Sequence, residues 1–169
     1  MTLVRASIVD VYPLRGSGAD FEVLGLRRAP DTRCGGSWEV VHGHVEGEES
    51  PVAAALRELR EETGVDAERL YNVSRVESFF LHRSNEIALI PAFAAFLDPG
   101  AAVRLSAEHD AHEWMKLDAA KNRLAWPREH RALEDIVTLF RGGNAGLLED
   151  VLRVSGPNRS SGPARVQAL

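Results

Sequence analysis

Residues 43–65 read GHVEGEESPVAAALRELREETGV, and this stretch decides the fold. Ser50 followed by Pro51 is typical of a helix start, because serine caps free backbone N–H groups and proline is tolerated in the first turn. Residues 51–63 are almost all strong helix formers. Gly64 then favours the left-handed conformation that ends a helix. The sequence therefore predicts one helix over residues 51–63, preceded by a loop rich in glycine and glutamate.

The expected helix separates its charged residues from its apolar ones. At about 100° per residue, one side collects Val52, Ala55, Leu56, Leu59 and Thr63, and the opposite side collects Arg57, Glu58, Glu61 and Glu62. Three carboxylates so close repel one another, and a divalent cation relieves that repulsion. Glu58 and Glu62 are one helical turn apart and could share one ion, whereas Glu61 could reach a second. Arg57, four residues before Glu61, can hold that carboxylate by a charged hydrogen bond.

A charged helix face is by itself weak support for a metal site. Strings such as Arg-Glu-Leu-Arg-Glu-Glu are common on solvated helices, where they form ion pairs. The preceding loop changes the balance, because Gly43 and Gly47 permit a bent backbone close to a ligand. Glu46 and Glu49 add two carboxylates beside the same helix start. Together these residues favour a hard cation such as Mg²⁺, which binds oxygen ligands and usually substrate phosphate as well.

The rest of the chain alternates strand and helix patterns around this segment. Strands are expected at residues 6–14, 21–28, 38–41, 73–81, 86–96 and 113–117, and further helices at 118–124 and 127–140. This order predicts an α/β fold in which helices bracket a central mixed sheet, an α/β/α sandwich. We expect one domain over residues 1–141 and a C-terminal extension over 142–169. The extension is expected to be flexible from about residue 155, where glycine, proline and serine accumulate.

Composition and charge disfavour a nucleic-acid-binding or membrane protein. The chain has 169 residues, 44% hydrophobic and 27% charged, with a formal net charge of −5. It has no long run of lysine and arginine, so nucleic acid is not expected as a partner. Its most apolar stretch, residues 87–97, is too short for a bilayer, and its start does not resemble a signal peptide. Cys34 is the single cysteine, so we expect an incidental thiol and a cytoplasmic location.

The spacing of the fixed residues resembles the signature of the Nudix hydrolase family. Five residues separate Gly43 from Glu49, seven more precede Arg57, and residues 57–65 read RELREETGV. The resemblance implies a Nudix α/β/α sandwich. It also implies hydrolysis of a phosphoanhydride bond in a nucleoside diphosphate-linked substrate, with Mg²⁺ as cofactor or Mn²⁺ in its place. Many members carry a proline and a glycine just before Glu49, and the glycine here, Gly47, comes one place earlier.

The resemblance also assigns roles within the signature. Glu58 and Glu62 would be the main metal ligands, with Glu61 and the carbonyl of Gly43 as helpers. The bound ions would neutralise phosphate charge and lower the pKa of the attacking water. Because the family places its general base variably, Glu58 remains one candidate for that role.

A second, finer resemblance is to the dihydroneopterin triphosphate pyrophosphatase group, whose members are also known as dATP pyrophosphohydrolases. It rests on residues 38–46 (WEVVHGHVE), on residues 105–114 and on Trp126. By this resemblance Glu108 becomes a metal ligand or the general base, and the substrate-binding residues are Arg27, His42 and Gly43. The other residues that stand out are expected to be structural: His109 and His112 in a loop, and Trp38 and Trp126 in the core.

These residues favour an enzyme that releases pyrophosphate from a nucleoside or pterin triphosphate. A dinucleoside polyphosphate hydrolase is an alternative, although Tyr71, the tyrosine after the helix, lies too near for the base-stacking role seen in that group. A nucleotide-sugar hydrolase is another alternative. A non-catalytic ligand sensor is disfavoured, because such proteins commonly lose the glutamates that this chain keeps. The partner would be a small nucleotide, and the sequence leaves monomer and homodimer open.

Overall fold

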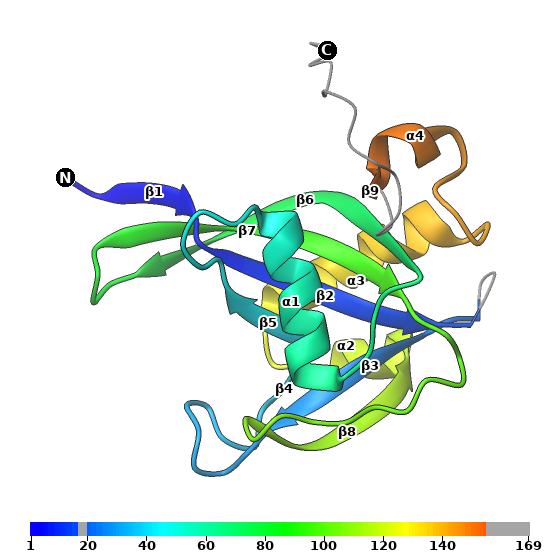
Figure 1. The fold of residues 1–169 in the computed structure, drawn as a ribbon, viewed down its shortest axis with the longest axis horizontal. Coiled ribbons are helices and arrows are strands. Elements are labelled where there is room, and N and C mark those ends of the chain that lie inside the picture. The colour runs from blue at the N-terminus through cyan, green and yellow to red at the C-terminus, as the bar shows by residue number, and fades with distance from the viewer. Residues whose placement is uncertain (17–19, 155–169) are drawn as a thin grey trace.

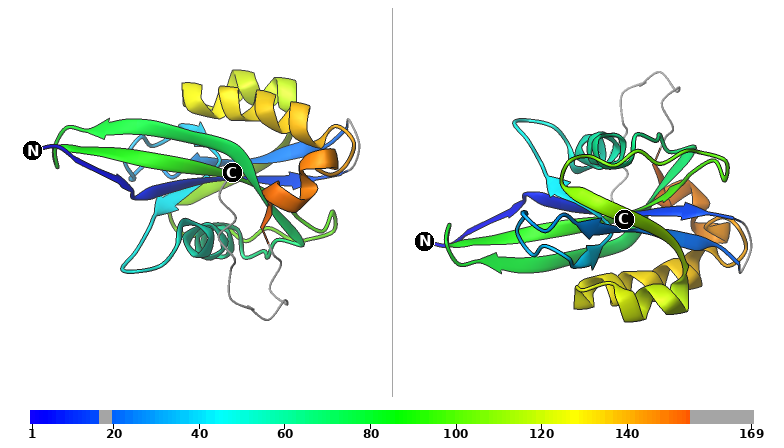
Figure 2. Two further views of the ribbon diagram at one scale, coloured as in Figure 1. Left: turned by 90° about the horizontal axis from the view of Figure 1, so that it is seen from above. Right: turned by 90° about the horizontal axis from the view of Figure 1, so that it is seen from below.

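The computed structural model describes residues 1–16 and 20–154, and the expected flexibility from about residue 155 lies outside these ranges. The strands are β1 (Leu3–Ala6), β2 (Ile8–Arg15), β3 (Glu22–Arg28), β4 (Trp38–Glu39), β5 (Val41–His44), β6 (Arg69–Leu81), β7 (Glu86–Phe96), β8 (His109–Lys116) and β9 (Arg153–Val154). The helices are α1 (Pro51–Thr63), α2 (Leu117–Arg123), α3 (Pro127–Phe140), the 3-10 helix η1 (Gly146–Leu148) and α4 (Glu149–Leu152). As Figures 1 and 2 show, α1 covers one face of the sheet and α2 and α3 cover the other, so the expected α/β/α sandwich is confirmed.

The sheet is mixed, as predicted, and follows the order β4-β3-β2-β7-β6-β9. β7 runs parallel to both β1 and β2, whereas the other strand pairs are antiparallel. β2 pairs with β5 from Ile8 to Val11, and with β3 only at Leu14 and Arg15. β5 thus pairs with the first half of β2. After His44, the last residue of β5, the chain leaves the sheet and enters the loop that leads into α1.

Helix α1 begins and ends where the sequence predicts. The Ser50 hydroxyl accepts a hydrogen bond from the backbone N–H of Ala53 at 3.2 Å. At the other end, Gly64 has a φ of 70° and donates its N–H to the Arg60 carbonyl at 2.8 Å. The helix packs on β2 and β5, which places its N-terminal loop beside the end of β5.

Glu62 requires a correction to the expected faces of α1. We expected it opposite the apolar residues, but only 6% of it is exposed. Glu62 follows Ala55 by seven residues, which is nearly two full turns, so both project from almost the same side of the helix. The buried side of α1 therefore carries a carboxylate next to the apolar residues Ala55 and Leu59.

Some strands differ from their predicted bounds. β6 starts at Arg69 and β8 at His109, before the predicted starts at 73 and 113. Both extensions pair with neighbouring strands, an interaction with distant residues that a local pattern does not encode. The strand expected over residues 38–41 is divided at Val40, whose N–H donates to the Glu129 carboxylate at 2.9 Å. β1 is a further strand that the sequence analysis missed.

The apolar core has two main layers, one between the sheet and helices α2 and α3 and one between the sheet and α1. The described part of the C-terminal extension packs on the domain: β9 pairs with β6, and Leu152 is buried. The Tyr71 hydroxyl also donates to Glu149 at 2.9 Å. None of the helices in the described ranges has the length and apolar character needed to cross a membrane.

Candidate active site

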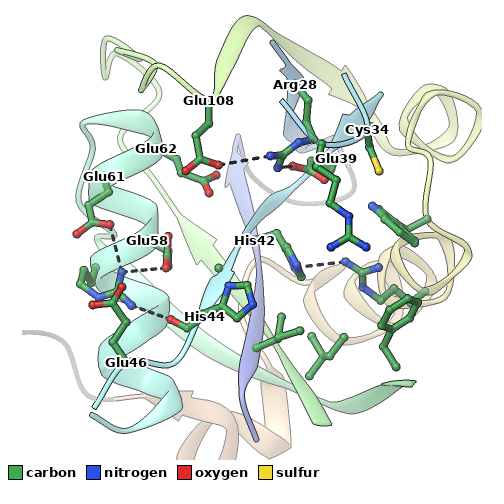
Figure 3. Close-up of a pocket in the computed structure, with 18 of the residues that line it drawn as sticks. Arg28, Cys34, Glu39, His42, His44, Glu46, Glu58, Glu61, Glu62 and Glu108 are labelled. Atoms are coloured by element: carbon green, nitrogen blue, oxygen red, sulfur yellow. Dashed lines mark hydrogen bonds and ion pairs between the residues drawn. The ribbon is translucent and has the colours of Figure 1, made fainter. Parts of the chain in front are cut away.

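A pocket of about 410 Å³ opens beside α1. Small-molecule sites usually have volumes of roughly 300–1,000 Å³, so this pocket is of suitable size. Its lining includes most of the residues expected from the sequence, namely His42, Gly43, Arg57, Glu58, Glu61, Glu62 and Glu108. Figure 3 shows the carboxylates of α1 on one side of the pocket, with Arg28 and Cys34 on the other.

Gly43 lies directly against the carboxylate of Glu58. A Cβ atom on residue 43 would sit 1.9 Å from Glu58 Cδ and 2.1 Å from its Oε1. Any side chain at this position of β5 would therefore displace the Glu58 carboxylate. The close approach of strand and helix, rather than an unusual backbone conformation, is what requires glycine here.

Arg57 is the centre of hydrogen bonding at the start of α1. Its Nη2 donates to Glu49 at 2.6 Å and to the His44 carbonyl at 2.8 Å. Its Nη1 donates to Glu58 at 2.8 Å and to Glu61 at 3.1 Å, so the predicted contact between Arg57 and Glu61 is confirmed. The hydrogen bond to Glu49 contributes most to raising the pKa of Arg57, which keeps the guanidinium charged. One side chain thus ties the loop to the helix and neutralises part of its acidic surface.

Glu62 is the carboxyl of the pocket whose ionisation is most strongly opposed by its surroundings. Its Oε2 is buried and has no hydrogen-bond partner among the residues that the structure describes. Burial raises the pKa of the Glu62 carboxyl to about 9, and the negative charges of Glu58, Glu39 and Glu108 add to the rise. Burial also raises the pKa of Glu58, although the hydrogen bond from Arg57 opposes that effect. Negative charge is therefore crowded on this wall, and a cation would relieve it.

The chemistry of this wall fits a divalent cation. Hard cations bind carboxylate oxygens, and Glu62 offers one that lacks any partner in the described structure. Within the described ranges, no three His, Cys, Asp or Glu side chains are already arranged to hold a metal ion. The carboxylates of Glu58 and Glu61 are instead turned towards Arg57. The carboxylates available to a cation on this wall are therefore those of Glu58, Glu61 and Glu62.

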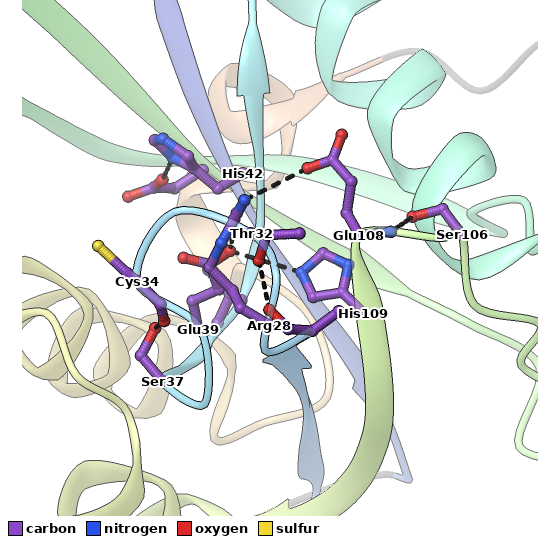
Figure 4. Close-up of polar contacts among 12 residues, drawn as sticks. Arg28, Thr32, Cys34, Ser37, Glu39, His42, Ser106, Glu108 and His109 are labelled. Atoms are coloured by element: carbon purple, nitrogen blue, oxygen red, sulfur yellow. Dashed lines mark hydrogen bonds and ion pairs between the residues drawn. The ribbon is translucent and has the colours of Figure 1, made fainter.

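Glu108 belongs to a second charged group, which β3, β4 and the start of β8 build (Figure 4). Arg28 donates its Nη1 to Glu39 at 2.8 Å and places its Nη2 3.5 Å from Glu108. His109 Nε2 lies 3.4 Å from the same oxygen of Glu39. Glu39 and His109 are buried, whereas the Glu108 side chain is 63% exposed. Arg28 therefore links a buried carboxylate to one that is free to meet a ligand.

The structure changes two expectations about these strands. Arg27 does not line the pocket, and its guanidinium pairs with Asp110 at 2.7 Å. Arg28 lines the pocket instead, because neighbouring residues of a strand point to opposite faces. The alternation could have indicated that one of the two arginines faces the pocket, but not which one. The expectation that His109 and His112 lie in a loop is wrong, since both belong to β8, where His109 is buried.

His42 and Arg128 line the pocket, and both contact the buried Asp10; the sequence analysis missed Asp10 and Arg128. His42 Nδ1 lies 2.6 Å from Asp10, and Arg128 Nε donates to the other Asp10 oxygen at 2.7 Å. Burial opposes the ionisation of Asp10, but His42 and Arg128 together lower its pKa. Arg128 lies 118 residues after Asp10, so no local pattern connects them. Only the packing of α3 against the sheet brings this group to the pocket.

The two tryptophans expected in the core have different positions. Trp38 packs against the core cluster beside α2 and α3, as expected. Trp126 is half-buried and lines the pocket, where its ring packs edge-to-face against Phe79 with centroids 6.0 Å apart. The pocket therefore has an aromatic part that the sequence analysis did not predict.

The sequence of this chain is similar to those of two curated proteins. The chain is 40% identical to an octanoyltransferase of Myxococcus xanthus over 118 residues, which cover 69% of this chain and 32% of that protein. It is 36% identical to the asymmetrical bis(5′-nucleosyl)-tetraphosphatase of Mus musculus over 85 residues, which cover 49% of this chain and 58% of that protein. The chain thus spans from about a third to somewhat more than half of the length of these relatives.

Solved structures give the same fold. The dihydroneopterin triphosphate pyrophosphohydrolase of E. coli superposes with a TM-score of 0.66 at 23% identity, over 82% of this chain and 99% of that one. The family model described as NUDIX domain matches residues 4–136, which is most of this chain. That match covers α1, the loop before it and the strands that carry Arg28 and Glu108. The chain therefore belongs to the Nudix family.

Proposed function

We propose that this protein is a Mg²⁺-dependent hydrolase that cleaves a phosphoanhydride bond of a nucleoside or pterin triphosphate and releases pyrophosphate. One observation carries the proposal: within the described ranges the buried Glu62 oxygen has no hydrogen-bond partner, and it is crowded by Glu58 in a pocket of ligand size. Such an arrangement is unfavourable without a cation and suits a phosphate site with one. The match to the NUDIX domain model and the tetraphosphatase relative at 36% identity support phosphoanhydride cleavage by this domain.

The residues of the chain would divide the work as follows. Glu58, Glu61 and Glu62 hold the cation, which when bound supplies charge neutralisation and an activated water. Arg57 keeps the α1 carboxylates and the preceding loop in place through its hydrogen bonds. Arg28 faces the pocket and offers a positive charge to phosphate oxygens.

Glu108 is the residue we propose as proton acceptor. Its carboxylate is exposed at the pocket, and its one ion pair with a described residue is to Arg28 at 3.5 Å. Glu58, in contrast, is half-enclosed between Gly43 and Arg57, which suits a metal ligand. A general base must be able to reach the attacking water, and Glu108 has that freedom.

A dinucleoside polyphosphate hydrolase is the second candidate, favoured by the tetraphosphatase relative. The position of Tyr71 argues against base stacking by that residue, because its ring is fully buried and packs on Phe96 and Phe140. The two candidates differ in their products. A triphosphate substrate releases pyrophosphate, whereas a dinucleoside tetraphosphate releases two nucleotides.

Metal dependence tests the proposed function directly. We expect turnover of at least one substrate in a panel containing the nucleoside triphosphates, dihydroneopterin triphosphate and a dinucleoside tetraphosphate, followed by pyrophosphate and nucleotide release. EDTA should abolish turnover, and Mg²⁺ or Mn²⁺ should restore it, because the crowded carboxylates need the cation to bind phosphate. Full turnover in metal-free buffer would contradict the mechanism, and release of two nucleotides without pyrophosphate would favour the second candidate.

The two candidate bases can be separated by their metal dependence. We expect Glu108→Gln to lower kcat by about 10²- to 10⁴-fold at every Mg²⁺ concentration, because the proton acceptor is lost. Glu58→Gln should instead raise the Mg²⁺ concentration needed for half-maximal turnover, since ligand loss is partly offset by mass action. The measurement is kcat against Mg²⁺ concentration for both variants. Parent-like turnover of Glu108→Gln at saturating Mg²⁺ would transfer the role of base to Glu58.

A further inference from the structure

The pocket has two chemically different ends. One end carries the carboxylates Glu58, Glu61 and Glu62, where we propose that the cation and the phosphates bind. The other end is apolar and is lined by Ile8, Phe79, Leu81, Ile90 and Trp126. A triphosphate needs only the first end, so the second end is available for the part of the substrate beyond the phosphates.

The apolar end is built around the pair Phe79 and Trp126. Their rings meet edge-to-face at an interplanar angle of 82°, and 39% of Phe79 remains exposed. The guanidinium of Arg128 lies over the Trp126 ring, 4.8 Å from its centroid. Arg128 and Phe79 thereby fix the orientation of the indole. The pair forms a pre-arranged aromatic surface, which reduces the entropic cost of binding a flat ring.

The polar side chains nearest this surface are engaged with one another. Arg128 donates two hydrogen bonds to Asp10, at 2.7 and 3.2 Å, and His42 Nδ1 contacts Asp10 at 2.6 Å. The buried residues Ile8 and Ile90 complete the apolar wall. This end of the pocket therefore offers ring faces and apolar surface, with its buried charges already neutralised.

From this arrangement we propose that Phe79 and Trp126 form a binding site for the planar heteroaromatic ring of the substrate, and that they recognise the ring by stacking and shape. A nucleobase and a pterin share this chemistry. The proposal rests on the proposed function for the position of the phosphates. Because stacking is tolerant of base identity, the enzyme should require a ring yet distinguish poorly between rings. Sites that read a substrate by hydrogen bonds, in contrast, discriminate by about 10⁴- to 10⁵-fold.

Phe79 and Phe80 provide a matched pair of variants. They are neighbours on β6 and so point to opposite faces of the sheet. Both are exposed, but only Phe79 is among the residues that line the pocket. Phe79→Ala removes the proposed stacking surface, Phe80→Ala removes a comparable exposed ring, and Phe79→Tyr restores an aromatic ring at the site. Thermal melts of all three variants reveal any general loss of folding.

The experiment measures binding by titration calorimetry in Mg²⁺ buffer, so it does not depend on turnover. The probes are AMP, CMP, dihydroneopterin monophosphate and ribose 5-phosphate, which share a phosphate and differ in the ring. The parent should bind the three ring-bearing probes about tenfold or more tighter than ribose 5-phosphate, and within about tenfold of one another. Phe79→Ala should reduce that advantage to about threefold or less, whereas Phe80→Ala and Phe79→Tyr should keep it.

Several outcomes would overturn the proposal. Equal binding of AMP and ribose 5-phosphate by the parent would show that no ring site exists. Equal losses in Phe79→Ala and Phe80→Ala would show a general effect on β6. A preference above about 100-fold for one ring would show recognition by hydrogen bonds and not by shape. Absence of triphosphate turnover with intact ring-dependent binding would remove the proposed function and leave this site standing.

Discussion

Replacing Glu62 with glutamine is expected to lower turnover severely and to stabilise the metal-free protein at the same time. The variant loses a carboxylate that we propose as a metal ligand, so kcat/KM should fall by about 100-fold or more. It also removes a buried carboxyl whose Oε2 has no partner in the described structure. Without metal, this carboxyl opposes folding at neutral pH, because it must take up a proton or keep a buried charge, and an uncharged amide of the same shape relieves that penalty.

The sign of this stability effect follows from the pKa of Glu62. Burial, together with the neighbouring carboxylates, raises the pKa from 4.5 to about 9 in the folded protein. Below pH 4.5 the Glu62 carboxyl is protonated in both the folded and the unfolded protein, so its burial costs no stability through ionisation. As the pH rises from 4.5 towards 9, the unfolded chain loses this proton while the folded protein keeps it, and the free energy of unfolding falls. At pH 7 the loss is on the order of 3 kcal/mol, and Glu62→Gln should recover it.

Thermal melts in EDTA between pH 5 and pH 8 measure this effect. The Tm of the parent should fall relative to that of Glu62→Gln as the pH rises, and Mg²⁺ should raise the parent Tm most at pH 8. The variant should respond little to Mg²⁺. If both proteins show parallel melting profiles with and without the cation, Glu62 neither carries the buried charge nor binds the metal.

Replacing Gly43 with alanine is expected to lower kcat/KM by about 100-fold or more with little loss of stability. The new Cβ would lie 1.9 Å from Glu58 Cδ, so the carboxylate must leave its position beside β5. Because that carboxylate ends a flexible side chain, the fold can adapt at low cost, whereas the proposed metal site loses the position of one ligand. Displacements of about 1 Å in a catalytic site can cost about 100-fold in rate.

Gly142→Ala is the control for this substitution. A Cβ at Gly142 meets nothing within 4 Å, so activity and Tm should match those of the parent. Turnover and thermal melts of both variants are the measurements. A Gly43→Ala protein with parent-like kcat/KM would show that the position of Glu58 against β5 is not needed for catalysis.

Helix α1 and its contacts were predictable because the information that specifies them is local. Ser50 and Gly64 cap α1 through hydrogen bonds within four residues, so the helix bounds could be read from the sequence. The contact of Arg57 with Glu61 spans one helical turn and was predicted for the same reason. The mixed sheet with helices on both faces followed from the order of strand and helix patterns along the chain.

What only the tertiary structure decided depends on contacts between distant residues. Strand alternation indicated that Arg27 and Arg28 face opposite ways, but the packing of β3 against β8 decided that Arg28 enters the pocket. The burial of Glu62 depends on which side of α1 meets β2 and β5. The aromatic pair Phe79 and Trp126 joins β6 to the start of α3, residues that no periodicity relates. Hydrogen bonds within a helix are set by nearby residues, whereas the lining of a pocket is set by how whole elements pack, and that information is spread over the entire chain.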